Sequence, residues 1–260
     1  MQGRRLLVTI ALLLSAFWGG LLGYMHLSGS MSFLDRLEAS ITDVRSTVIG
    51  AKEPPPVTSI VAIDDQTAVD NGYPLNRATL ARVVAAVSAF KPKVIALDLL
   101  LVDPGPEEGD AALAVALHQS PSVIAAAGVF PKDTQAVDHD ANDPLAAIPA
   151  ASQMLLPLSR FSDVAAIGVV NVATDESGTP RFIPLISRSG ARVDASFPLR
   201  VASLALGINP AFSPGGLALG DRHLPTDDGQ RLPITFYGPR APFRLSARRM
   251  CWPANSPPRQ

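Results

Sequence analysis

The chain has little of what most enzymes and nucleic-acid-binding proteins need. Its 260 residues contain a single cysteine, Cys251, so neither a disulfide framework nor a thiolate zinc cluster is available. Lys and Arg number 22 against 23 Asp and Glu, which lacks the basic excess that nucleic-acid binding favours. The four histidines are isolated, and no phosphate-binding glycine loop or nucleophile motif occurs. We therefore expect no metal, no cofactor, no catalytic residue and no nucleic-acid partner.

Charged side chains are also missing from Leu6–Leu27, a run of 22 residues without Asp, Glu, Lys or Arg. As a helix this run would be roughly 33 Å long, enough to cross the hydrocarbon core of a membrane. Arg4 and Arg5 precede it, so the positive-inside bias places the N-terminus in the cytoplasm. We expect residues 1–28 to form one uncleaved transmembrane anchor. A cleaved signal peptide is the alternative, but the apolar core of such a peptide is usually shorter.

The next segment, residues 29–56, has the pattern of a stalk. Its apolar residues recur with helical spacing at Phe33, Leu34, Leu37, Ile41, Val44 and Val48. Pro54-Pro55-Pro56 then favours a stiff, extended spacer. We expect an amphipathic helix that leaves the membrane and leads into residues 57–239.

That central region has the pattern of an α/β fold. Two apolar runs, Ser59–Ile63 and Lys93–Leu97, predict buried strands, and apolar residues between them recur with the period of a helix. Asn76 is the expected N-cap of this helix, and Lys91-Pro92 is expected to end it. Buried strands joined by a crossover helix are typical of a parallel sheet. We predict a largely parallel central sheet with flanking helices and an antiparallel hairpin.

The remaining elements follow in order along the chain. They are a helix opened by Asp110, strands at Ser122–Ala127, Ile167–Val172 and Arg181–Ser187, a helix at Phe197–Leu206 with Gly207 as its C-cap, a strand at Gln230–Tyr237, and an irregular tail over residues 240–260. Arg181–Ser187 is expected to be the hairpin partner of Ile167–Val172. Pro131–Pro144 is polar and predicts a surface loop.

Acidic residues follow both of the first two strands. Asp64 and Asp65 come after the first, and Asp98 comes after the second. Ligands usually bind at the C-terminal edge of parallel strands, so these carboxylates are candidates for a polar ligand or a divalent cation. The alternative is that each carboxylate caps a turn or a helix. Arg77 could pair with Asp64 or Asp98, as a ligand group or as a buried structural ion pair.

Several stretches together resemble a known family, the CHASE sensor domain of the second type. The motifs that carry the resemblance are Ile63-Asp64-Asp65, Tyr73-Pro74-Leu75-Asn76-Arg77, Lys93-Val94-Ile95-Ala96-Leu97-Asp98, Gly168-Val169-Val170-Asn171-Val172 with Asp175, Gly178 and Arg181, and Ser196-Phe197-Pro198-Leu199-Arg200 running to Gly207. The resemblance covers residues 32–239. The proline turn departs from the family pattern, because Tyr73 and Leu75 stand where the family usually has tryptophans.

The resemblance implies an extracytoplasmic input domain of a bacterial receptor, anchored once in the inner membrane and homodimeric in the full receptor. It implies an unknown small-molecule or protein stimulus, and it adds Asn171, Asp175 and Arg181 to the candidate ligand-binding residues. Asp175 to Gly178 also fits a tight structural turn. Family members carry further membrane helices and a cyclase, histidine kinase or diguanylate cyclase output. Here the resemblance stops near Pro239, so we expect a shortened receptor without its output domain.

We therefore expect a membrane-anchored sensory domain that is not an enzyme. One alternative is a periplasmic α/β domain that binds a metal or a phosphoester, with weak or no catalysis. Adjacent acids such as Asp64 and Asp65 point to opposite sides, which suits metal-assisted phosphoryl transfer poorly. A purely structural interaction domain is the other alternative.

Overall fold

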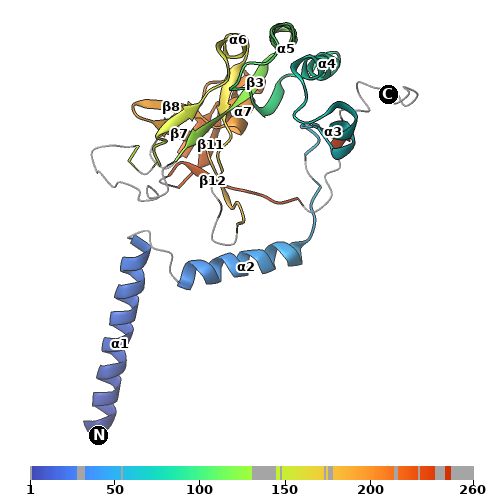
Figure 1. The fold of residues 1–260 in the computed structure, drawn as a ribbon. Coiled ribbons are helices and arrows are strands. Elements are labelled where there is room, and N and C mark those ends of the chain that lie inside the picture. Colours follow the sequence, from blue (N-terminus) through green and yellow to red (C-terminus); the bar gives the residue numbers. More distant parts are fainter. Residues whose placement is uncertain are drawn as a thin grey trace. The chain divides into compact units, whose positions relative to one another are not determined.

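The computed structural model describes residues 2–27, 33–53, 55–130, 145–146, 148–172, 174, 178–213, 216–227, 229–237 and 244–246. Contacts divide the chain into two units, Met1–Pro54 with Phe236–Arg240 and Pro55–Thr235 with Ala241–Gln260. The first unit holds the two N-terminal helices, drawn in blue in Figure 1, and the second holds the other helices and the sheets. The predicted loop at Pro131–Pro144 lies outside the described residues.

The first unit consists of α1 (Gln2–Leu27) and α2 (Phe33–Ile49), which confirms the two expected helices. Within α1, Leu7–Tyr24 is apolar and long enough to cross a membrane, a test that a signal sequence near the N-terminus would also pass. After α2, the backbone N–H of Lys52 donates to the carbonyl of Tyr237 at 3.0 Å. This contact brings a short C-terminal segment into the first unit.

The second unit is organised around β3 (Ser122–Val129), whose residues are almost all buried. Strand β2 (Ile95–Leu100) runs parallel to it, and so does β5 (Ala166–Val169) on its other side. A short strand, β4 (Gln153–Leu155), pairs antiparallel with the last three residues of β3. A strand buried on both faces has no polar alternation, which explains the continuous apolar sequence of β3. The parallel core of the sheet is therefore confirmed for these three strands.

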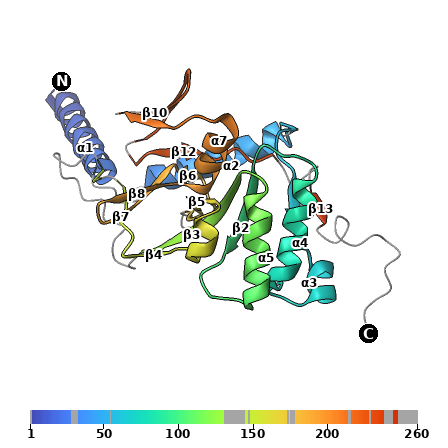
Figure 2. The same cartoon turned by 90° about the horizontal axis from the view of Figure 1, so that it is seen from above.

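One face of this sheet is covered by α4 (Arg77–Ser88) and α5 (Glu107–His118), which lie side by side (Figure 2). Their buried residues share one core with Ile124 of β3 and Phe161 of α6 (Ser159–Ser162). A short helix, α3 (Asp65–Asn71), follows the first strand. Asn76 accepts a hydrogen bond from the Thr79 N–H at 2.8 Å, so it is the N-cap of α4, as expected.

The other face of the sheet receives α7 (Phe197–Leu206). In β5, Ile167 packs toward the core of α4 and α5, so its neighbour Gly168 points to the opposite face. A Cβ on Gly168 would lie 2.6 Å from the Phe197 Cα, and only glycine lets the helix come this close. Gly207 ends α7 with φ 68°, which confirms the expected C-cap.

The rest of the second unit consists of small sheets. Three of them have two strands: β6 (Phe182–Pro184) with β12 (Arg231–Pro233), β7 (Ile186–Ser189) with β8 (Arg192–Ala195), and β1 (Ile60–Ala62) with β13 (Arg244–Ser246). The fourth has three strands, with β10 (Gly216–Leu219) between β9 (Ala211–Ser213) and β11 (Arg222–Pro225). The pair of β1 with β13 is parallel, and all the other pairs in these small sheets are antiparallel. A second small core forms around Leu185, Leu199 and Leu217.

The expected neighbour of β1 is wrong. In the described part of the chain β1 pairs with β13, and β2 pairs only with β3. Ile60, Val61 and Ala62 stand opposite Arg244, Leu245 and Ser246, inside the tail that was expected to be irregular. Apolar side chains show that a strand is covered but do not specify which strand pairs with its backbone.

Two further expectations need correction. Arg181–Ser187 is not a hairpin partner of β5 but divides into β6 and β7, because Pro184 has no N–H to continue one ladder. The hairpin is instead β7 with β8, turning at Gly190 with φ 57°. Helix α5 begins at Glu107, three residues before Asp110, where its first-turn carboxylates suit the positive end of the helix dipole.

Candidate functional site

The N-termini of α4 and α5 are joined by a buried ion pair. The Arg77 Nε lies 3.2 Å from the Asp110 Oδ1, with 17% and 2% of the two side chains exposed. Arg77 also donates to the Asp103 carbonyl at 3.0 Å, and its guanidinium lies 6.0 Å from the centre of the Phe161 ring. The expected partners of Arg77 were Asp64 or Asp98, and both are wrong. Asp110 is the partner because α4 and α5 pack together along their length.

This ion pair also holds the loop that follows β2. The Gly105 N–H donates to the second carboxylate oxygen of Asp110 at 2.9 Å. A Cβ at Gly105 would lie 2.8 Å from the Arg77 Cγ and 2.9 Å from the Asp110 Oδ1. Asp110 is therefore satisfied by an arginine and a backbone amide, and the loop 101–106 is fixed against both helices. Such a buried, fully bonded pair maintains structure and offers no open coordination position.

The three candidate carboxylates occupy different surroundings. Asp64 is the N-cap of α3 and accepts a hydrogen bond from the Thr67 N–H at 2.9 Å. Asp65 is exposed in the first turn of the same helix. Asp98 lies inside β2, not after it, and is exposed on the face opposite Leu97, which packs toward α4 and α5. Among the described residues no group of three or more His, Cys, Asp or Glu side chains could hold a metal ion.

Asn171 has a structural role that can be seen directly. Its side-chain amide donates to the Gly128 carbonyl at 2.8 Å and accepts from the Gly128 N–H at 2.6 Å. It thereby continues the pairing of β3 with β5 beyond Val169, using a side chain in place of a backbone.

Arg181 supplies a carbonyl that accepts from the Ile234 N–H at 2.8 Å. Asp175 lies outside the described residues. Ligand contact by the seven candidate residues stays a prediction.

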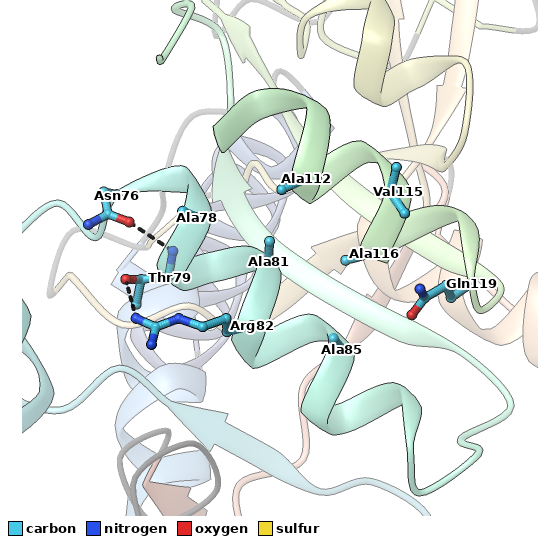
Figure 3. A pocket seen from close by; sticks show the side chains of 10 residues that line it. All are labelled: Asn76, Ala78, Thr79, Ala81, Arg82, Ala85, Ala112, Val115, Ala116 and Gln119. Carbon is cyan, nitrogen blue, oxygen red and sulfur yellow. Dashed lines mark hydrogen bonds between the residues drawn. The ribbon is translucent and has the colours of Figure 1, made fainter. Parts of the chain in front are cut away.

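An open groove lies between α4 and α5 on the side away from the sheet (Figure 3), with a volume of about 550 Å³. Its floor consists of alanines from both helices, with Ala81 and Ala116 buried. Its lining residues are Asn76, Ala78, Thr79, Ala81, Arg82, Ala85, Ala112, Val115, Ala116 and Gln119.

Polar groups stand at the rim of this groove. The Arg82 guanidinium donates to the Thr79 hydroxyl at 3.0 Å, while Gln119 is the C-cap residue that follows α5 (Figure 3). The groove is therefore shallow and wide open, with methyl groups at its floor and polar side chains at its rim. The groove was not predicted. The signal that could have found it is the alanine spacing on the two helices, because small residues let helices approach and leave a furrow.

Among the described residues of the second unit, Arg160, Arg192 and Arg231 also form close ion pairs, and the pKa of the first two is raised. Arg160 of α6 makes two bonds to Glu107 of α5, at 3.0 and 2.9 Å, and this hydrogen bonding raises the pKa of Arg160. In the β7–β8 hairpin, hydrogen bonds to Asp194 raise the pKa of Arg192, with a closest approach of 2.7 Å. The first pair links α6 to α5 and the second lies within β8, and each of these arginines has a carboxylate partner.

The fold and the site together define an α/β domain with a parallel sheet core, helices on both faces and a surface groove, preceded in the sequence by an apolar helix. The family model described as CHASE2 domain matches residues 8–253. The chain therefore belongs to the CHASE2 domain family, whose members are extracytoplasmic sensory domains and not catalytic ones. No curated protein and no solved structure matches the chain.

Proposed function

We propose that this chain is a membrane-anchored sensory input domain that detects a stimulus outside the cytoplasm of a bacterium. The family match over residues 8–253 carries the proposal, because CHASE2 domains are extracytoplasmic sensors. In this proposal α1 crosses the inner membrane once and the second unit receives the stimulus. In a complete receptor the signal passes to a cyclase, kinase or diguanylate cyclase output.

The anchor is supported by α1 and by the charges around it. Leu7–Tyr24 contains no charged residue, whereas Arg4 and Arg5 precede it. An apolar helix of this length is stable in hydrocarbon because its backbone groups are all bonded internally. The two arginines favour a cytoplasmic N-terminus, which leaves α2 and the second unit outside.

Fractionation tests this proposal directly. The chain, expressed in bacteria, should stay with the membrane pellet after a carbonate wash, and protease added to spheroplasts should digest it beyond α1. A soluble mature chain that starts near Ser30 would identify a signal peptide instead. Protection from external protease would place the domain in the cytoplasm and would contradict a sensor of external stimuli.

The groove between α4 and α5 is the proposed contact site for the stimulus, with the exposed Asp98 face of β2 as the competing site. Thermal unfolding of the purified chain against a panel of small organic acids and amphiphilic peptides would find a stabilising compound, since binding to the native state alone raises Tm. Arg82→Gln should abolish the shift if the groove binds the compound, and Asp98→Asn should leave it. The reverse result would assign the stimulus to the sheet face.

The absence of catalysis is tested with the same preparation. Incubation with a panel of phosphoesters, with and without Mg²⁺, should give no turnover above a heat-unfolded control. Turnover that depends on Mg²⁺ and is lost in Asp98→Asn would favour a phosphoester-binding enzyme over a sensor.

A further inference from the structure

Helix α3 ends at an Asn-Gly step. Asn71 is its last residue and Gly72 is its C-cap, and among the six asparagines of the chain only Asn71 is followed by glycine. In such a step the backbone nitrogen of the glycine can reach the side-chain amide carbon of the asparagine, because glycine has no Cβ to crowd the approach. The sequence therefore marks one asparagine as chemically different from the others.

The backbone nitrogen of Gly72 has no hydrogen bond to hold its proton. In α4, α5, α6 and α7 the N–H of the C-cap residue donates to a carbonyl at the end of its own helix. Among the described residues no acceptor is found for the Gly72 N–H, and Gly72 leaves the helix with φ 78° and ψ 160°. A hydrogen bond from the protonated form of a group keeps the proton in place, so this N–H loses its proton more readily than the N–H groups of the other C-caps.

The end of α3 has little packing around it. Of its seven residues only Thr67 is buried, and a Cβ added at Gly72 would meet no atom within 4 Å. Short helices are marginal without tertiary packing, and helix ends with few contacts open locally while the rest of the unit stays folded. Such opening gives Asn71 the extended backbone that ring closure needs and that an α-helix does not provide.

The side chain of Asn71 is held through the same turn. Its Nδ2 donates to the Thr67 carbonyl at 3.1 Å, and this bond is released when the last turn of α3 opens. Two other asparagines are fixed by the fold, because Asn76 caps α4 and Asn171 bridges to Gly128 of β3. Their amide groups stay in place as long as the second unit is folded, so the opening of α3 favours reaction at Asn71 alone.

We propose that Asn71 is a site of spontaneous covalent modification, at which the Asn71–Gly72 step becomes an aspartate or isoaspartate step. The Gly72 nitrogen gives its proton to hydroxide and bonds to the Asn71 Cγ, and the bond from Cγ to Nδ2 breaks as ammonia leaves with a proton from water. The five-membered imide that results takes up one water at either carbonyl and opens to a carboxylate. In sum, one amide and one water give one carboxylate and one ammonium ion. The inference does not rest on the proposed function.

The product carboxylate weakens the end of α3. It lies next to Asp70 at the negative end of the helix dipole, and it has no N–H to donate to the Thr67 carbonyl. We expect hydrogen exchange of the last α3 amides to become about two- to fivefold faster, the factor that corresponds to an unfavourable charge at a helix end. Because α3 lies between β1 and α4, the modification loosens the connection that leads into α4 and accumulates with the age of the chain.

Peptide mapping by mass spectrometry tests the site on the purified full chain in mild detergent. After incubation in mildly alkaline buffer we expect the mass shift from amide to acid at Asn71, with ammonia released in equal amount. Asn76 and Asn171 should show no shift. The reaction should slow in acidic buffer, because the Gly72 nitrogen must lose its proton to hydroxide.

Two matched variants complete the test. Asn71→Gln should abolish the shift at this position, because attack on the longer side chain would have to close a six-membered ring. Asn209→Gln makes the same change at an exposed asparagine that precedes Pro210, which has no N–H to attack. This control should leave the reaction at Asn71 unchanged.

Three results would overturn the inference. If Asn71 reacts in concentrated urea but not in native buffer, the folded end of α3 protects it. If Asn71 reacts in neither, the step is not a modification site. If Asn76 and Asn171 react in native buffer as fast as Asn71, the free Gly72 N–H does not decide the site.

Hydrogen exchange tests the consequence separately. Asn71→Asp carries the product charge from the start and should exchange faster at the end of α3, whereas Asn71→Gln keeps an amide and should exchange like the wild type. Equal exchange in the two variants would refute the loosening of α3. Membrane fractionation, which tests the proposed function, measures a different property, so a failed anchor would leave these results as they stand.

Discussion

Replacing Asp110 with alanine should strongly destabilise the second unit. The substitution leaves the Arg77 guanidinium, whose side chain is only 17% exposed, without its carboxylate, and it leaves the Gly105 N–H without its acceptor. Removing one partner of a buried ion pair costs about 3–5 kcal/mol, mostly because a charge remains buried and unpaired. Since Arg77 keeps some contact with solvent, we expect the lower end, about 3 kcal/mol.

The assay is thermal unfolding of the purified full chain in mild detergent. For a domain of this size a loss of 3 kcal/mol lowers Tm by roughly 6–12 °C. Asp110→Asn should fall between wild type and Asp110→Ala, because its amide oxygen can still accept one hydrogen bond but its NH₂ group would face a donor. Glu107→Ala is the matched control. It removes an ion pair from the same helix, with 79% of Glu107 exposed, and should change Tm too little to resolve.

Two results would refute this reasoning. If Asp110→Ala unfolds at the wild-type temperature, Arg77 has another partner or is solvated in the native chain. If Glu107→Ala is as damaging as Asp110→Ala, then burial does not decide the strength of these two pairs. A fall in Tm for Asp110→Ala alone, reduced when Arg77 is also replaced by methionine, would confirm the buried pair, since removing both charges leaves nothing unpaired.

Three further substitutions test the packing around the sheet by the same measurement. Gly168→Ala should cost about 1–3 kcal/mol, because its new Cβ would meet the Phe197 backbone at 2.6 Å and overpack the contact; an unchanged Tm would mean that α7 does not lie on β5. Asn171→Ala should cost about 1–3 kcal/mol by leaving the buried backbone of Gly128 without partners, and a neutral result would rule out that bridge. Asn76→Ala should cost about 0.5–2 kcal/mol as a lost N-cap, whereas Asn76→Asp, which can cap equally well, should cost little; equal losses would contradict capping.

Local signals in the sequence predicted the elements that local physics controls. Asn76 caps α4 and Gly207 ends α7 because capping depends on a side chain or a φ angle within one turn of the helix. The apolar run of β3 predicted a buried strand, which is confirmed, and the apolar runs of the first two predicted strands indicated a parallel sheet, which is confirmed for β2 beside β3 but not for β1 beside β2. A long run without charged residues predicted α1 and the helical spacing of apolar residues predicted α2, because both are properties of one segment alone.

The candidate site depended on contacts between distant residues, and the sequence predicted it only in part. Arg77 was identified as the cation at the start of α4, but its partner is Asp110, 33 residues further on, and not an acid after a strand. Any of several carboxylates could have paired with it, because a charge attracts every opposite charge that the fold brings near. The groove between α4 and α5 was missed for a similar reason, since it exists only where two alanine faces meet.

The sequence by itself determined that α1, α2, α4 and α7 form helices, that β2 and β3 form apolar strands, and which residues cap α4 and α7. Only the tertiary structure decided the partners: β1 with β13, Arg77 with Asp110, and the side chain of Asn171 with the backbone of Gly128. Helix and strand propensities and the spacing of apolar residues depend on a few neighbouring residues, so the sequence of each segment determines them. A pairing between distant segments is chosen by the packing of the whole unit, because many similar strands and charges could satisfy one another equally well in isolation.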